Sequence, residues 1–167
     1  MTRRKKILAG MVVAVVLAAA ASVSWYLIAG RDSQALGAMT TRAEQVMPFD
    51  LSRTTHTFAK TVNGGAEKVV VNDPADAKNQ ELIRSHLRME AALFKSGNYS
   101  APAKIHGMDM PGLKELEAGA THVNVLFAEV PGGAQITYSS TDPSLVSAIH
   151  AWFDQQVADH SMPGMGG

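Results

Sequence analysis

The stretch TTHTFAKTVNGGAEKVVVNDP, residues 54–74, carries the pattern that decides the fold. Two segments rich in apolar and β-branched residues, 55–62 and 67–72, flank Asn-Gly-Gly at residues 63–65. Asn-Gly and Gly-Gly supply the positive φ that a tight hairpin needs, so we predict two antiparallel strands. The Asp-Pro pair that follows suits the N-cap and first position of a helix, which we expect over residues 75–95.

The same series of elements occurs again in the second half of the chain. Predicted strands at residues 122–129 and 134–139 flank Pro-Gly-Gly, and a second Asp-Pro pair opens a helix over residues 143–159. A loop over residues 96–112 and a short helix over residues 113–118 connect the halves. We therefore predict an α+β fold, a four-stranded antiparallel sheet with two helices on one face, and a degenerate ββα-ββα repeat is a hypothesis.

The N-terminal segment predicts a membrane anchor. Residues 7–30 form a run of 24 residues without a charge, and a helix of that length spans the ~30 Å hydrocarbon core. The basic residues 3–6 precede it, which favours a single-pass inner-membrane protein with its domain on the periplasmic, extracytoplasmic side. Cleavage after the small residues 18–20, which would release the domain into the periplasm, is the alternative.

The remaining chain divides into a linker, one domain and a tail. Residues 31–50 lack a sustained period and are expected to be a linker, and residues 161–167 a flexible Met/Gly tail. Residues 51–160 are sufficient for one hydrophobic core.

Charge and the lack of cysteine exclude several classes of function. Without its first six residues the chain has 11 basic and 15 acidic residues, a net charge of −4, which argues against a nucleic-acid partner. With no cysteine, thiolate metal sites, iron–sulfur clusters and covalent haem attachment are excluded. A metal ion would be bound by His, Met or carboxylate groups.

The stretch IHGMDMPGL, residues 105–113, offers imidazole and thioether ligands close together. In an extended segment alternate side chains share a face, so His106, Met108 and Met110 would project together. Met is also a pliable core filler, so burial of both thioethers, with His106 in water, is the alternative.

Three further histidines stand on or near apolar faces of predicted elements. His56 shares a strand face with Phe58, while His86 and His150 fall within the apolar stripes of the two helices. Each is either a core histidine bonded to a polar group or a side chain that faces a site.

These residues together indicate transition-metal binding, with copper as the first candidate, because thioether favours Cu(I) and imidazole accepts both oxidation states. We expect a membrane-anchored extracytoplasmic protein for copper sensing, storage or delivery. Its expected metal ligands are His56, His86, His106, Met110 and His150.

Three alternatives remain open at this point. The first is a non-metal module that binds a protein partner or a small ligand at the membrane surface. The second is non-covalent haem binding with His86 or His150 as axial ligand. The third is a small enzyme with a histidine base, although the sequence contains no recognisable nucleophile elbow or phosphate-binding loop.

Four segments resemble a family of small exported bacterial proteins: TTHTF at 54–58, LIRSHLRMEAALF at 82–94, YSAPAKIHGMDMPGL at 99–113 and ITYSSTDPSLVSAIHAWFDQQVADH at 136–160. The resemblance covers nearly all of residues 51–160 and places the same five candidate ligands first. Members of that family are often labelled aspartate carbamoyltransferase. The transcarbamoylase fold has two α/β domains and needs about twice this length, so we reject that activity on size.

Overall fold

The computed structural model describes residue 34, residues 37–107 and residues 109–160. The compact unit that begins at Met39 contains every element discussed below. The predicted membrane anchor (residues 1–30) and the predicted tail (residues 161–167) lie outside the described residues. Within the described part of the chain, no helix is both long and apolar enough to cross a membrane.

Four antiparallel strands form one sheet, as predicted. β1 (Thr54–Thr61) and β2 (Gly64–Val71) make the first hairpin, and β3 (Asn124–Val130) and β4 (Gly133–Ser139) make the second. The strand order is β1-β2-β4-β3, so β2 and β4 pair in the centre of the sheet. Each hairpin closes through a two-residue loop, Val62–Asn63 in the first and Pro131–Gly132 in the second. The first turn lies earlier than the predicted Asn-Gly-Gly at residues 63–65, because Gly64 and Gly65 already pair within β2.

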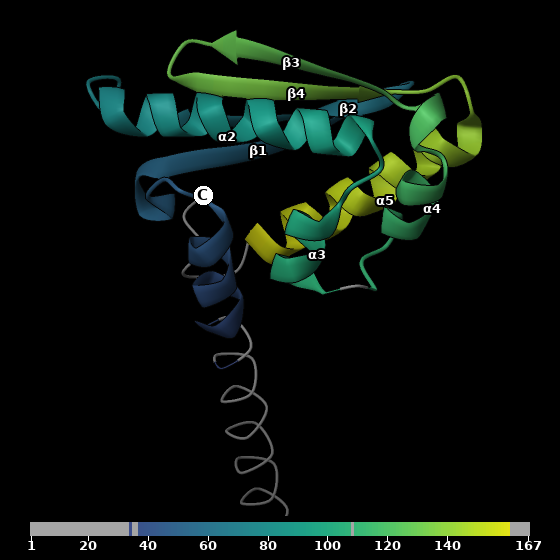
Figure 1. Cartoon of the computed structure of the whole chain (residues 1–167), viewed down its shortest axis with the longest axis horizontal. Coiled ribbons are helices and arrows are strands. Elements are labelled where there is room, and N and C mark those ends of the chain that lie inside the picture. The colour runs from purple at the N-terminus through teal and green to yellow at the C-terminus, as the bar shows by residue number, and fades with distance from the viewer. Residues whose placement is uncertain (1–33, 35–36, 108, 161–167) are drawn as a thin grey trace, which may run out of the picture. The chain divides into compact units, whose positions relative to one another are not determined.

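Two long helices cover the same face of this sheet (Figure 1). α2 (Ala77–Lys95) contacts β2, β3 and β4, while α5 (Pro143–His160) contacts β1 and β2. The element order therefore contains strand–strand–helix twice. Between the two series lie α3 (Ser100–His106), α4 (Leu113–Ala118) and a 3-10 turn (Ala120–His122), and another 3-10 turn (Leu51–Arg53) precedes β1.

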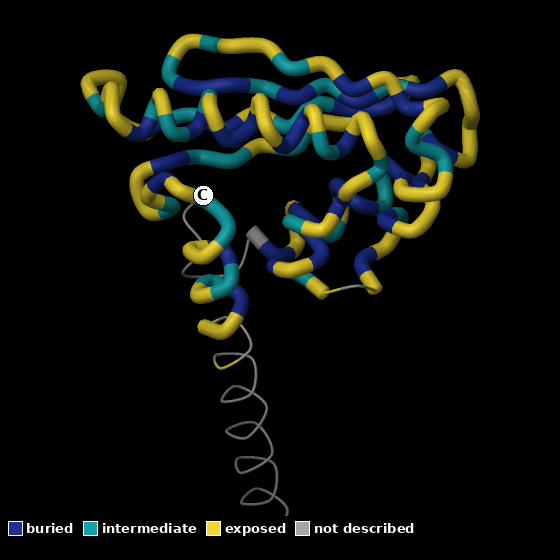
Figure 2. Tube along the Cα trace, in the orientation of Figure 1, coloured by how far each residue is buried: buried dark blue, intermediate teal, exposed yellow. Residues whose placement is uncertain are grey.

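An aromatic cluster holds the helices against the sheet. Trp152 on α5 lies 5.3 Å from Tyr138 of β4 and 5.9 Å from Phe94 of α2, measured between ring centroids. Phe94 stacks on Tyr99 at 4.8 Å, with ring planes 14° apart. Figure 2 shows the buried residues concentrated between the sheet and the helices, so this layer is the single core expected for a chain of this length.

Two segments differ from the prediction. Residues 39–46 are helical rather than an irregular linker, and Met39, Ala43 and Phe49 are buried. The expected loop over residues 96–112 contains α3. Pro102 lies in the first turn of α3, where a helix does not use the missing N–H, so this proline does not interrupt it.

The start of α2 is also shifted. Asp76, not Asp73, is its N-cap, and its side chain accepts a hydrogen bond from the backbone N–H of Asn79. Asp73 instead accepts from the N–H of Ala75 and closes a turn before the helix.

The close approach of β2 and β4 predicts that Gly133→Ala destabilises the fold. A Cβ atom at position 133 would lie 2.1 Å from the carbonyl oxygen of Val69, which is backbone and does not rotate away. We expect the free energy of unfolding to fall by about 1–3 kcal/mol in urea denaturation. Lys68→Ala, at an exposed position of β2, is the control and should change it by less than about 0.5 kcal/mol. Equal effects of the two substitutions would contradict this account.

Candidate ligand-binding cavity

A cavity with both apolar and ionisable lining residues lies inside the core, between the sheet and the helices. Its 18 lining residues come from the segment 46–49, β1, β2, β4, α2, α3 and α5. Its volume is about 40 Å³, room for roughly two or three water molecules. Six of the lining residues are polar or ionisable: His56, Glu67, His86, Glu90, His106 and Gln156. A cavity with this lining inside an apolar core is unusual, because buried polar groups need partners.

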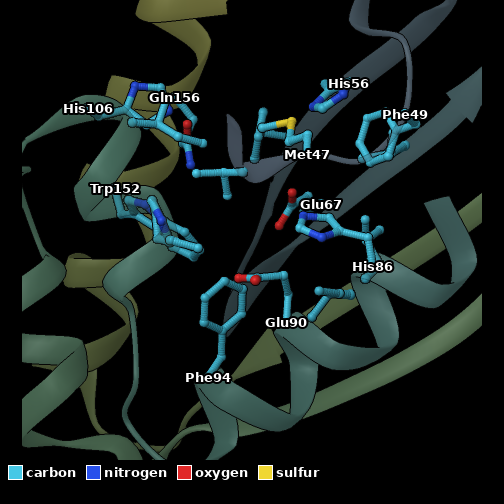
Figure 3. A pocket seen from close by; sticks show the side chains of 18 residues that line it. Met47, Phe49, His56, Glu67, His86, Glu90, Phe94, His106, Trp152 and Gln156 are labelled. Atoms are coloured by element: carbon cyan, nitrogen blue, oxygen red, sulfur yellow. The ribbon is translucent and has the colours of Figure 1, made fainter. Parts of the chain in front are cut away.

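Three of the predicted histidines meet at this cavity. His56 comes from β1, His86 from α2 and His106 from the last residue of α3. Figure 3 shows their rings on different sides of the same space. Phe49 lies between two of them, with its ring centroid 5.8 Å from that of His56 and 5.7 Å from that of His86. Residues far apart in sequence are therefore gathered by the fold.

His86 is a neutral imidazole at neutral pH. The residue is 7% exposed, and desolvation lowers its pKa to about 4. Burial disfavours the charged ring because the low-dielectric interior solvates it poorly. A neutral imidazole retains the lone pair that a metal ligand or a hydrogen-bond acceptor uses.

His106 is oriented by a buried carboxyl group. Its Nδ1 lies 2.6 Å from Oδ2 of Asp159, and the two side chains are 2% and 9% exposed. Gln155 donates to the other oxygen of Asp159 at 2.8 Å. Burial lowers the pKa of His106; the nearby Asp159 opposes that shift, and the Arg42 guanidinium adds to it. In the neutral ring Nδ1–H is then the donor to Asp159, which leaves the lone pair on Nε2.

Two carboxyl groups in the cavity were not predicted. Desolvation raises the pKa of both Glu67 and Glu90 to about 7, and their mutual repulsion contributes to the shift of Glu67. Tyr138 donates to Glu67 at 3.1 Å, which partly offsets the increase. All the lining residues belong to the described part of the chain, and none of them is Lys or Arg. The cavity therefore contains carboxyl and imidazole groups without a Lys or Arg side chain.

The sequence did carry a signal for both glutamates. Glu67 alternates with Val69 and Val71 on β2, and so points to the helix-covered face. Glu90 follows His86 by one helical turn on α2 and lies beside Leu87 and Ala91 on its buried face. An acidic residue at a buried position of a strand or helix indicates a site, and the periodicity alone would have found both.

Two buried polar atoms of residues that line the cavity have no hydrogen-bond partner among the described residues. They are Nε1 of Trp152 and Oε1 of Gln156, on successive turns of α5. The two residues are 1% and 6% exposed. A buried polar atom without a partner costs stability, so these atoms indicate that the cavity receives water or a ligand.

The other two predicted ligands lie elsewhere. Nε2 of His150 is 2.9 Å from the carbonyl oxygens of both Thr61 and Gly64, so this histidine holds the end of the first hairpin to α5. Met110 is 6% exposed and packs in the core. It does not line the cavity, although it shares a shallow outer depression with His106. Met108 lies outside the described residues.

A thioether does reach the cavity, from a residue that the sequence did not single out. Met47 follows the helical residues 37–46 and lines the cavity with its sulfur in view in Figure 3. Among the described residues no group of three His, Asp or Glu side chains is placed to hold a metal ion. A metal ion in the present arrangement would therefore combine at most two such groups with the thioether of Met47.

The size of the cavity bears on the haem alternative. At about 40 Å³ it is far smaller than the ~300–1,000 Å³ of pockets that bind drug-sized molecules. A haem group does not fit without a large rearrangement of the core. The cavity suits an ion, a few waters or the end of a small molecule.

Comparison with known proteins gives no relative. No family model matches the chain, and no curated protein and no solved structure matches it either. The functional argument therefore depends on the cavity itself.

The raised pKa of Glu90 predicts that Glu90→Gln changes the free energy of unfolding by an amount that depends on pH. Because its folded pKa of about 7 exceeds the ordinary value of 4.5, the folded state retains a proton that the unfolded chain loses. The contribution of the Glu90 carboxyl to the free energy of unfolding is fully present below pH 4.5 and is lost as the pH rises through about 7. The substitution should therefore increase the free energy of unfolding by about 1–3 kcal/mol more at pH 8 than at pH 4.

Urea denaturation at the two pH values measures this difference. Glu81→Gln, on the exposed side of the same helix, is the matched control and should show little dependence on pH. A gain for Glu90→Gln that is the same at pH 4 and pH 8 would show that the Glu90 carboxyl is not desolvated.

Proposed function

We propose that this domain binds a copper ion in the cavity, for sensing, storage or delivery. The single observation that carries the proposal is that His56, His86 and His106, from three separate elements, line one buried cavity. The proposed location is the extracytoplasmic side of a membrane, with the N-terminal segment as a single-pass anchor.

Two properties of the histidines support metal binding. Desolvation holds His86 neutral, and His106 is turned by its bond to Asp159 so that the neutral ring carries its lone pair on Nε2. A carboxyl group bonded to the second ring nitrogen is common behind metal-binding histidines, because it fixes the ring and increases its basicity.

The available ligands favour Cu(I) over harder ions. Thioether sulfur is a soft ligand, and imidazole accepts copper in either oxidation state. Since no three His, Asp or Glu side chains among the described residues are placed around one point, an ion that needs several nitrogen and oxygen ligands fits poorly. Cu(I) accepts few ligands, and we propose that two of the cavity imidazoles and the Met47 thioether supply them. His150 and Met110 are not part of this proposed ligand set.

One observation favours a second candidate, a small organic cation. Glu67 and Glu90 share a cavity with the rings of Trp152 and Phe94, and no Lys or Arg lines it. Carboxyl groups and aromatic faces together attract an ammonium group. This candidate keeps the role of the cavity but needs no metal ligand.

Copper titration of the purified full-length protein tests the proposal. We expect one equivalent of Cu(I) to be retained in competition with a Cu(I)-specific chelator such as bicinchoninate. His86→Ala combined with His106→Ala should weaken the affinity by at least about 100-fold, because even changes behind a ligand cost about 10–100-fold.

Two histidines outside the cavity provide matched controls. His122 is exposed, and His150 is bonded to the hairpin, so alanine at either position should leave the copper affinity unchanged. Retention of copper by the double cavity variant, or no retention by the wild type, would refute the proposed function. Tight binding of methylammonium by a protein that takes no copper would establish the second candidate.

A further inference from the structure

His106 is the one histidine of the cavity that also lines the outer depression, together with Asp109, Met110 and Gln155. Its side chain is only 2% exposed, so the ring itself is buried at the cavity. The orientation of this ring decides whether a nitrogen lone pair is presented to an ion in the cavity.

We propose that Asp159 is the positioning residue of the copper site and holds His106 in the tautomer whose Nε2 binds the ion. The inference rests on the proposed function. Its basis is geometric: Oδ2 of Asp159 lies 2.6 Å from Nδ1 of His106, with both side chains at least nine-tenths buried. With Nδ1 engaged as the donor, only Nε2 of the neutral ring has a lone pair.

The surroundings fix this arrangement from both sides. Gln155 donates to Oδ1 of Asp159 and so prevents the carboxyl from rotating away from the ring. On the other side, Nε of Arg42 donates to the carbonyl oxygen of Ile105 at 2.8 Å, which fastens the last turn of α3 just before His106. These two contacts hold the His106 ring and its carboxyl partner in place.

Asp159→Asn tests the positioning role in the full-length protein. We expect the Cu(I) affinity to fall about 10–100-fold. Asp154→Asn, at an exposed position of the same helix, is the control and should leave the affinity unchanged. In a His106→Ala background, Asp159→Asn should have no further effect on the affinity, because a residue that acts through another loses its effect when that partner is removed. A structural tie alone would instead lower thermal stability and leave the affinity as it was.

Nitrogen-15 NMR of the histidine rings gives a second measurement that needs no variant. In the copper-free wild type we expect Nδ1 of His106 to be protonated and Nε2 to be unprotonated, and addition of Cu(I) should shift the Nε2 signal. The opposite tautomer, or wild-type affinity in Asp159→Asn when His106→Ala is weakened, would overturn the positioning role alone. A wild type that binds no copper would overturn this role together with the proposed function.

Discussion

Trp152 is the side chain on which the rest of the structure depends. Its ring contacts Phe94 of α2, Tyr99 before α3 and Tyr138 of β4, so one residue of α5 joins elements from both halves of the chain. Edge-on contacts between large rings give both buried area and a defined geometry. The same indole forms one wall of the cavity. The packing that closes the fold therefore also sets the size of the polar space beside it.

The polar space is costly to a domain of this size. Glu67, Glu90 and His86 all have pKa values shifted toward their neutral forms by desolvation, which means that the fold disfavours charge on each of them. An apolar core at the same place would avoid this cost. Retention of ionisable groups that oppose stability is the usual mark of a functional site, where the environment is arranged for a ligand rather than for packing.

The hairpins and long helices could be predicted because their signals are local. Glycine pairs and Asp-Pro pairs place them to within a few residues, and the helical pattern of α2 already placed His86 on its buried face. The packing of residues 39–49 was missed, although Met39, Ala43, Val46 and Met47 recur at helical spacing. A helix this short is marginal by itself and depends on tertiary packing, so its pattern is a weak signal. The role of His150 could not be predicted, because its hydrogen-bond partners are carbonyl groups 86 and 89 residues away in the sequence.

In the stretch IHGMDMPGL, tertiary packing separates side chains that their spacing in the sequence predicted to lie together. Alternation would have placed His106 and Met110 together, but His106 ends a helix and turns to Asp159, while Met110 fills the core. The soft ligand that does reach the cavity is Met47, which lies 59 residues before His106 and comes from the segment that sequence patterns assigned to a linker. The cavity walls thus come from residues 46–49, the first ββα series, β4, α3 and α5. Any ligand that contacts several of these walls binds only the folded arrangement, so its binding energy adds directly to the stability of the fold. Residues 39–49 and α3 lie outside the sheet and its two covering helices, and their packing around the cavity is the part of the structure that such a ligand would strengthen most.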